Sequence, residues 1–545
     1  MKSKLFILFF FQTSFLFAQI GKNPQVFSHD DTLRGSITPE RLWWDLKFYE
    51  LRLRVSPDQK YIEGTNVITY KVLNAQNVLQ IDLQPPLSIK SIFQDGQELF
   101  FKKDGSNAYM VQLQKTQIVG NTESIKIYYA GKPKVARRAP WDGGFSWGKD
   151  TDGNPFVATS CQGLGSSVWW PCKDHMYDEP DSMLIGITVP NSLMDVSNGR
   201  LRKVIENQDN TKTYEWFVSN PINNYGVNVN IGNYSHFSEE YEGEKGALSL
   251  NYYVLPEHLD LAKEQFKDVK RMLKAFEHWF GPYPFYEDGY KLVEVPYLGM
   301  EHQSSVTYGN KFKNGYLGSD LSGTGWGLKW DFIIIHESGH EWFANNITYK
   351  DIADMWIHES FTNYSENLFT EYYYGKEAGA EYVIGTRKKI QNDRPIIGVY
   401  NVNHEGSSDM YYKGGNMLHT IRQIINDDDK WRGILRGLNS TFYHQTVTSK
   451  QIEEYISQQA GIDFSKVFDQ YLRNTAIPTL EYQQNGKKLS YKWTTCIDGF
   501  NMPVKVKIDG KEIWLKPSTK TQKLKTSGTI EVDKNFYVLE KLGIE

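Results

Sequence analysis

Two histidines spaced four residues apart, with a glutamate beside the first, form the strongest candidate for chemistry in this chain. His336, Glu337 and His340 belong to the word His-Glu-Ser-Gly-His, which follows the apolar run 332–335. On a helix, residues i and i+4 share a face, so both imidazoles can reach one cation. Imidazole nitrogen is a good zinc ligand, and a catalytic zinc takes three protein ligands and a water. The word therefore predicts a zinc site that needs one more ligand.

The candidate for the third ligand is Glu359, which follows His340 after an interval of eighteen residues. That interval lets one helix end, the chain turn, and a second helix pack antiparallel with its carboxylate facing both histidines. We expect one zinc ion per chain on His336, His340 and Glu359. Glu337 points about 100° around the helix from His336, where it can take a proton from the metal-bound water. Because zinc lowers the pKa of that water to about 7, the set predicts a metal-assisted hydrolase with Glu337 as general base.

The elements that must hold this site are predicted to be helices. Apolar residues recur at three- and four-residue steps from about residue 257 to the turn Gly281-Pro282-Tyr283-Pro284, which predicts a long amphipathic helix. Further helices are expected over 330–345, 354–374, 376–390, 414–425 and 452–460. Alternating patterns broken by turn residues predict strands from about 45 to 235 and again after Pro478. The chain is therefore predicted to have a multidomain α+β fold.

Four segments follow from these patterns. They are a signal peptide over 1–18, an N-terminal β-sheet domain over 19–240, a helical catalytic domain over 241–476, and a short C-terminal β-sandwich-like domain over 477–545. The first segment has the layout of a signal peptide, because Lys2 and Lys4 precede the apolar run 5–11, and Ala18 closes the short polar-to-apolar stretch that follows this run. The run is far shorter than the ~20 residues of a membrane span. We expect an exported protein, periplasmic or secreted, with no membrane span.

Composition excludes some partners. Lys and Arg total 61 against 65 Asp and Glu, a net charge of -4, so no basic excess is available for phosphates and nucleic acid is not expected as a partner. The three cysteines, Cys161, Cys172 and Cys496, cannot form a disulfide framework in a chain of 545 residues. A single bridge between Cys161 and Cys172 stays an open alternative. The sequence gives no indication of the oligomeric state.

Five sequence elements between residues 161 and 414 occur together in a known family. They are Cys161-Gln162, Gly281-Pro282-Tyr283-Pro284, Gly299-Met300-Glu301-His302, the metal word with its acid eighteen residues on, and Tyr411-Tyr412-Lys413-Gly414. In order and spacing, the chain resembles the zinc aminopeptidases typified by aminopeptidase N and the leukotriene hydrolase, within the gluzincin metallopeptidases. The resemblance implies a thermolysin-like helical catalytic domain. It also implies removal of N-terminal residues from peptides with a free N-terminus.

The resemblance gives roles to residues around the metal. It implies that Glu301 binds the substrate's free amine and that Tyr411 donates a hydrogen bond to the tetrahedral oxyanion. Physical chemistry agrees, because a carboxylate near the metal distinguishes a terminal ammonium from an internal amide by charge, and a phenol stabilises a developing oxyanion. Tyr412 is the rival of Tyr411. The remaining predicted substrate-binding residues are Gln162, Gly299, Met300 and His302.

The chain also departs from the family's pattern. His302 stands where the family has Asn, and an imidazolium there would compete with the substrate's ammonium, so we expect substrate affinity to weaken as pH falls through about 6.5. Gln162 stands where Glu is common, although the leukotriene-hydrolase branch carries Gln, so amine binding depends mainly on Glu301. Leu298 replaces the motif's first Gly. His358 precedes Glu359 where Asn is usual, and we interpret it as a supporting or surface residue.

Two alternatives stand beside the aminopeptidase hypothesis. A zinc endopeptidase, or a hydrolase of another small substrate, could use the same scaffold if Glu301 does not meet an amine. A catalytically silent peptide-binding relative would be favoured by loss of a metal ligand or of the base. His336, Glu337, His340 and Glu359 are all present, which favours an enzyme. Comparing activity on a free-amine substrate with activity on its N-acetylated form separates the aminopeptidase hypothesis from the hypothesis of an endopeptidase or another small-substrate hydrolase.

Overall fold

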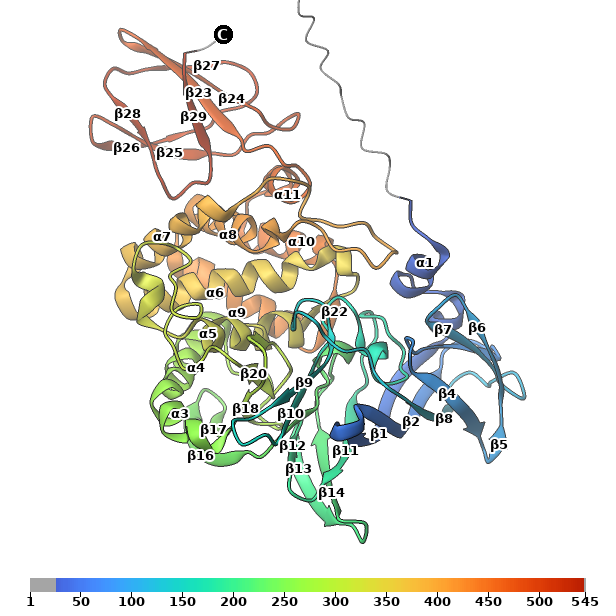
Figure 1. Ribbon diagram of the computed structural model, residues 1–545. Coiled ribbons are helices and arrows are strands. Elements are labelled where there is room, and N and C mark those ends of the chain that lie inside the picture. Colours follow the sequence, from blue (N-terminus) through green and yellow to red (C-terminus); the bar gives the residue numbers. More distant parts are fainter. Residues whose placement is uncertain (1–25, 544–545) are drawn as a thin grey trace, which may run out of the picture.

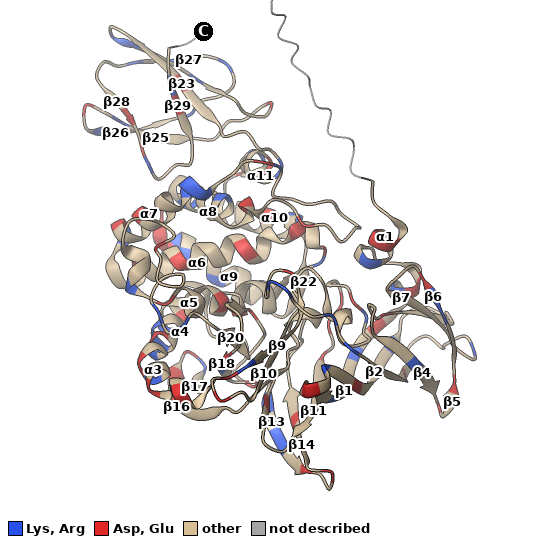
Figure 2. Ribbon diagram, in the orientation of Figure 1, with Lys and Arg blue, Asp and Glu red and all other residues tan. Residues whose placement is uncertain are grey.

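The computed structural model describes residues 26–543 as an N-terminal β region, a helical region and a small C-terminal β region (Figure 1). The multidomain α+β fold predicted from the sequence is confirmed. The predicted signal peptide, 1–18, lies outside the described residues. Among residues 26–543, the helices are too short or too polar to cross a bilayer. Acidic and basic residues are interspersed along the ribbon, in keeping with the small net charge (Figure 2).

The N-terminal region is built on an eight-stranded sheet. In β1, Trp44–Ser56, buried side chains alternate with partly exposed ones, which places Leu51, Leu53 and Val55 on the core face. The strands follow one another across the sheet as β13 Arg200–Glu206, β14 Thr211–Val218, β11 Ser182–Pro190, β1, β2 Tyr61–Val72, β8 Thr122–Gly131, β4 Ser88–Gln94 and β5 Gln97–Glu98. Only β1 and β11 pair in parallel among these strands.

Two smaller sheets and two short helices complete this region. One sheet contains β12 Met194–Val196, β15 Asn230–Gly232, β10 Pro155–Ser160 and β9 Gly144–Lys149. The other contains β3 Val78–Asp82, β7 Ala108–Gln112 and β6 Phe100–Asp104. The helices are α1 His29–Gly35 and α2 Pro39–Leu42. Strand β10 ends at Ser160, so Gln162 stands just beyond the end of a strand.

A five-stranded sheet begins the catalytic region. Its order is β16 Ser235–Gly243, β17 Gly246–Val254, β18 Tyr290–Glu294, β20 Val306–Tyr308 and β19 Gly299–Met300. The predicted domain boundary between residues 240 and 241 therefore falls inside β16, and a boundary before Ser235 agrees better with the sheet. Strand β19 is one of the two edge strands, and Glu301 follows it directly.

The helices of the catalytic region follow this sheet. They are α3 Leu259–Gln265, α4 Lys267–Phe280, α5 Phe332–Gly339, α6 Trp356–Tyr374, α7 Lys376–Gly385, α8 Tyr412–Ile425, α9 Asp428–Thr441, α10 Ser449–Ala460 and α11 Ser465–Leu472. A parallel pair, β21 Ile347–Tyr349 and β22 Gln445–Val447, lies among them. The single long helix predicted before residue 281 is two helices that meet at Phe266. The helix predicted over 330–345 is shorter than expected, because α5 ends at Gly339 and the turn that follows, Glu341–Asn345, leaves helical geometry at Phe343 and Ala344.

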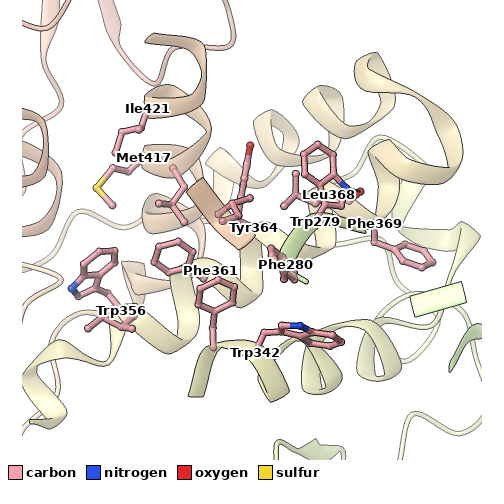
Figure 3. Close-up of a cluster of buried hydrophobic side chains, with 14 of the residues drawn as sticks. Trp279, Phe280, Trp342, Trp356, Phe361, Tyr364, Leu368, Phe369, Met417 and Ile421 are labelled. Carbon is pink, nitrogen blue, oxygen red and sulfur yellow. Dashed lines mark hydrogen bonds between the residues drawn. The ribbon is translucent and has the colours of Figure 1, made fainter. Parts of the chain in front are cut away.

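Helix α6 runs through the core of the catalytic region. Its residues from Trp356 to Thr370 are all buried, so it is covered on every side. Figure 3 shows Trp356 and Phe361 of this helix in the same aromatic cluster as Trp342 of the turn that follows α5. Phe361 stacks on Phe343 with ring centroids 4.5 Å apart. This packing fixes α6 and, with it, the position of Glu359.

The C-terminal region consists of two sheets. The first contains β27 Gln522–Lys525, β24 Lys488–Thr494, β23 Thr479–Asn485 and β29 Leu539–Leu542. The second contains β26 Lys511–Leu515, β25 Val504–Ile508 and β28 Ile530–Val532. Leu480 and Leu489 of the first sheet and Val504 of the second belong to the same buried cluster as the helices of the catalytic region, so this cluster continues from that region into both sheets. The predicted boundary between 476 and 477 falls between α11 and β23.

Candidate active site

The two histidines of the metal word are positioned by α5. Asp331 caps this helix, because its carboxylate accepts hydrogen bonds from the backbone N–H groups of Ile333 and Ile334 at 3.0 and 3.3 Å. His336 lies inside the helix, and His340 is the residue that ends it. Their ring centroids are 5.1 Å apart. The i and i+4 spacing therefore brings both imidazoles to one point, as expected.

Glu359 completes a set of three ligands. Its Oε2 lies 3.8 Å from Nε2 of His336 and 3.5 Å from Nε2 of His340. These separations suit three ligands around one tetrahedral zinc with bonds of about 2.0–2.2 Å. Oε2 of Glu359 is buried and has no hydrogen-bond partner among residues 26–543, which is costly unless a cation satisfies it. The donor set thus fits zinc, which, when bound there, would supply Lewis acidity and lower the pKa of a water.

Both imidazoles are oriented through their other ring nitrogen. Nδ1 of His336 lies 2.8 Å from Oε1 of Glu366, a fully buried acid on α6. Nδ1 of His340 lies 3.0 Å from the carbonyl oxygen of Phe343 and 3.0 Å from the hydroxyl of Thr362. These contacts leave Nε2 of each ring free to act as a metal ligand. Sequence reasoning did not find Glu366 or Thr362, although Glu366 lies seven residues, two helical turns, after Glu359.

Glu337 lies beside this set. Its carboxylate, that of Glu301 and one nitrogen of His340 all lie within 4.8 Å of one another. Burial is the main reason why the pKa of Glu337 is raised to about 7 in the metal-free protein. The charge of His336 lowers this pKa, and the charge of Glu301 raises it. A carboxylate with a pKa near neutrality can both take and return a proton, which is the requirement for a general base.

Glu301 and Gln162 form the neighbouring wall of the site. Nε2 of Gln162 donates to Oε1 of Glu301 at 2.6 Å and to Oε1 of Glu359 at 2.9 Å. The side chain of Asn345 fixes the backbone of this wall by donating to the carbonyl oxygen of Glu301 at 3.0 Å. Gln162 comes from the N-terminal region, so both regions contribute to the site. The predicted amine-binding acid and a predicted metal ligand are therefore joined by one amide group.

Tyr411 and Tyr412 both line the cavity, but they face different acids. The ring of Tyr411 stacks against that of His336, with centroids 6.1 Å apart. Burial raises the pKa of Tyr411 well above its ordinary value, and the charge of Glu359 raises it further, so the phenol keeps its proton. The charge of Glu366, behind the metal ligands, acts on Tyr412 instead. Tyr411 is thus the better placed hydroxyl for donating to a substrate oxygen.

The structure gives a different position to His302 from the one we expected. Its side chain is fully buried and is not among the residues that line the cavity, unlike Gly299 and Met300. Burial lowers the pKa of His302 to about 3, so the imidazole stays neutral through the range where we expected a pH response. The prediction of an imidazolium competing with substrate is therefore wrong.

Gly299 allows β19 to approach α5, because a Cβ at this position would lie 2.7 Å from Cγ2 of Ile333.

The site lies in a cavity of about 810 Å³. This volume is in the range typical of ligand sites, about 300–1,000 Å³. The predicted ligands and base line it together with Gln162, Glu301 and Tyr411. Its outer part includes Trp141, which is 70% exposed, and the basic residues Lys389 and Arg394. The structure thus brings every predicted site residue except His302 to one cavity.

Comparison with known proteins identifies the family. The description "Peptidase M1 N-terminal domain" matches residues 46–225, and "Peptidase family M1 domain" matches residues 264–471. The second match contains the three metal-ligand candidates, the base and Tyr411. The chain belongs to peptidase family M1.

Named relatives and solved structures agree with this assignment. The chain is 22% identical over 479 residues to a probable aminopeptidase 2 of Sulfurisphaera tokodaii, covering 84% of this chain and 55% of that protein. It is 22% identical over 441 residues to leukotriene A-4 hydrolase of Xenopus laevis, covering 77% and 68%. A crystal structure of an M1 zinc metallopeptidase from Deinococcus radiodurans shares the fold, with a TM-score of 0.68, 20% identity, and coverage of 82% and 98%. The chain thus spans between about half and two thirds of these two curated relatives.

Proposed function

We propose that this protein is a zinc-dependent aminopeptidase that hydrolyses the N-terminal peptide bond of peptides. The observation that carries the proposal is the Glu301 carboxylate, which lies in the cavity beside the metal-ligand candidates and is tied to Glu359 through Gln162. A terminal ammonium held by Glu301 has its peptide carbonyl close to the metal position, whereas an internal amide has no charge to offer there. The names of the curated relatives, aminopeptidase and leukotriene A-4 hydrolase, support the same class.

The residues of the chain divide the reaction between them. Glu301 and the amide oxygen of Gln162 bind and orient the substrate's ammonium. Glu337 takes the proton of the attacking water at its carboxylate and returns it to the leaving amine nitrogen. The hydroxyl of Tyr411 donates a hydrogen bond to the carbonyl oxygen as negative charge develops on it. Bond cleavage then releases an amino acid and a peptide shorter by one residue.

The test compares an aminoacyl anilide that has a free amine with its N-acetylated form. We expect the wild-type protein to need the free amine, and Glu301→Ala to reduce kcat/KM for the free-amine substrate by about 10–100-fold, the value of a charge-assisted hydrogen bond. Glu405→Ala is the matched control, because Glu405 is another acid that lines the cavity. Equal hydrolysis of both substrates by the wild type would favour the endopeptidase alternative.

We also propose that one zinc ion binds per chain and that the protein is exported. Zinc content of the purified protein, measured by elemental analysis, tests the first proposal, with one equivalent expected. The N-terminal layout of Lys2, Lys4 and the apolar run 5–11 supports export. Sequencing the N-terminus of the mature protein tests it, with a start near Gln19 expected in the periplasmic or culture fraction. An intact N-terminus on protein retained inside the cell would contradict it.

A further inference from the structure

The turn that carries Gln162 is held from outside by two side chains. Gln162 follows the end of β10, and the next residue, Gly163, has a carbonyl oxygen that accepts two hydrogen bonds. Nη2 of Arg34 donates to this oxygen at 3.2 Å, and Nδ2 of Asn403 donates to it at 3.1 Å. Because Gly163 has no side chain, these hydrogen bonds, and not packing of its own, fix its peptide group. The residue next to Gln162 is therefore tied to two segments that are distant in the sequence.

These two segments also touch each other. Arg34 belongs to α1 of the N-terminal region, and Asn403 lies between α7 and α8 of the catalytic region. A Cβ on Gly35, the last residue of α1, would lie 2.1 Å from the carbonyl carbon of Val402 and 2.2 Å from the backbone nitrogen of Asn403. Only glycine allows two backbones to approach so closely. Glu405, two residues beyond Asn403, lines the active-site cavity, so α1 packs directly on a segment that forms part of the cavity wall.

Arg34 is itself held in a defined position. Its side chain is 14% exposed, and Nη2 lies 3.9 Å from Oδ2 of Asp174. The backbone carbonyl oxygen of Arg34 accepts a hydrogen bond from Nη1 of Arg41 at 3.1 Å. At the other end of α1, Oδ1 of Asp30 accepts the backbone N–H of Ser106 at 2.9 Å. Both ends of α1 are thus anchored to the N-terminal region, and the guanidinium is directed at the Gln162 turn.

We propose that Arg34 is a positioning residue for Gln162, and that α1 is in this way a structural part of the active site. This inference rests on the proposed aminopeptidase function. The amide of Gln162 donates to Glu301 and to Glu359 at once, at 2.6 and 2.9 Å, which leaves it little freedom to move. A displacement of the turn by about 1 Å would break at least one of these hydrogen bonds and misdirect the amide oxygen that binds the substrate's ammonium. The carbonyl of Gly163 therefore connects α1 to substrate recognition.

The kinetic test uses Arg34→Ala, which removes one of the two donors. We expect KM for a free-amine aminoacyl anilide to rise about 3–10-fold, with kcat changed less than about twofold, because loss of a hydrogen bond from a charged donor loosens the turn. Arg436→Ala is the control, since Arg436 also donates to a backbone carbonyl oxygen, that of Glu277, and is not among the residues that line the cavity. Zinc content should equal that of the wild type in both variants. An unchanged KM in folded, zinc-loaded Arg34→Ala would overturn the proposal.

A double-mutant cycle with Gln162 separates positioning from a general loss of structure. If Arg34 acts through Gln162, Arg34→Ala should raise KM by less than about twofold in a Gln162→Ala protein, since no amide is left to position. An increase by the same factor in both backgrounds would contradict the proposal, because the effects of independent sites add. Asn403→Ala removes the second donor and leaves α1 unchanged, so it should raise KM about 2–10-fold, the usual effect of one neutral hydrogen bond. An unchanged KM in this folded variant would contradict the role of the Gly163 carbonyl.

Crystal structures test the positioning step without substrate, and they also cover the case in which Arg34→Ala does not fold. In zinc-loaded Arg34→Ala, we expect Nε2 of Gln162 to move beyond hydrogen-bond distance of Glu301 or Glu359, and an unchanged amide would overturn the proposal. In the zinc-loaded wild type, the Gly163 carbonyl oxygen should lie within about 3.5 Å of Nη2 of Arg34, and a longer separation would overturn the proposal as well. The aminopeptidase function fails separately, if the wild type hydrolyses free and acetylated substrates equally, because these structures are measured independently of the reaction.

Discussion

Glu366 provides the most informative test of how the metal site is built. The carboxylate of Glu366 is fully buried, and its Oε1 lies 2.8 Å from Nδ1 of His336. Glu366→Gln preserves the shape of the side chain but removes the charge that orients and polarises the imidazole. Loss of such a partner typically costs 10–100-fold in metal affinity, which is about 1.4–2.7 kcal/mol. We expect the zinc dissociation constant to increase by that factor.

The assay is competition for zinc with a chromophoric chelator, supported by a thermal melt of each variant. Thr362→Val is the matched comparison, because His340 would keep its 3.0 Å contact with the carbonyl oxygen of Phe343 after the hydroxyl is lost. We therefore expect less than about a threefold change in zinc affinity for Thr362→Val. Unchanged zinc affinity in folded Glu366→Gln, or an equal loss in both variants, would refute the reasoning.

Three further predictions concern the same site. Glu359→Ala should lose zinc but remain folded, because α6 is held by its own apolar contacts, and full zinc occupancy by atomic absorption would exclude Glu359 as a ligand. Glu337→Gln should keep zinc and lower kcat by about 10²–10⁴-fold. Tyr411→Phe should lower kcat by a similar factor. If Tyr412→Phe abolished activity and Tyr411→Phe left it unchanged, the roles of the two tyrosines would be reversed. Burial lowers the pKa of His340, but the charges of Glu359 and neighbouring acids raise it to about 10 in the metal-free protein. Zinc must displace that proton, so its affinity should rise about tenfold per pH unit between about pH 6 and 8, and a flat profile by chelator competition would contradict this.

The metal ligands could be predicted because their spacing is a local property of helices. His336 and His340 lie on one face for any α-helix, and the interval to Glu359 is long enough for a turn and a return helix. The residues that orient them were not predicted, since Glu366, Phe343 and Thr362 are common residue types with no marked spacing. Their role is revealed only by the contacts of α5 and the turn after it with α6.

Errors in the fold have similar physical causes. Apolar residues continue through Phe266 on one face, so the periodicity does not reveal the break between α3 and α4. Helix α11, Ser465–Leu472, has eight residues, too few for a clear periodic pattern. Helix α9 was missed although Trp431, Ile434, Leu435 and Leu438 have helical spacing, since Gly433 and Gly437 lower its helix propensity. The prediction that His302 contacts the substrate was wrong, because sequence order alone does not show which way a side chain points after an edge strand.

The neutral side chain at Gln162 changes the electrostatic balance of the amine end of the cavity. Glu301, Glu337 and Glu359 already place three carboxylates within a small buried volume, where like charges repel strongly. A fourth acid at position 162 could bind an ammonium, but it would have no proton with which to satisfy the other carboxylates. The amide group of Gln162 has two N–H bonds, and the structure directs one to Glu301 and the other to Glu359. Its oxygen remains an acceptor for the substrate, so the loss of one charge is offset by a fixed link between the amine-binding acid and a metal ligand.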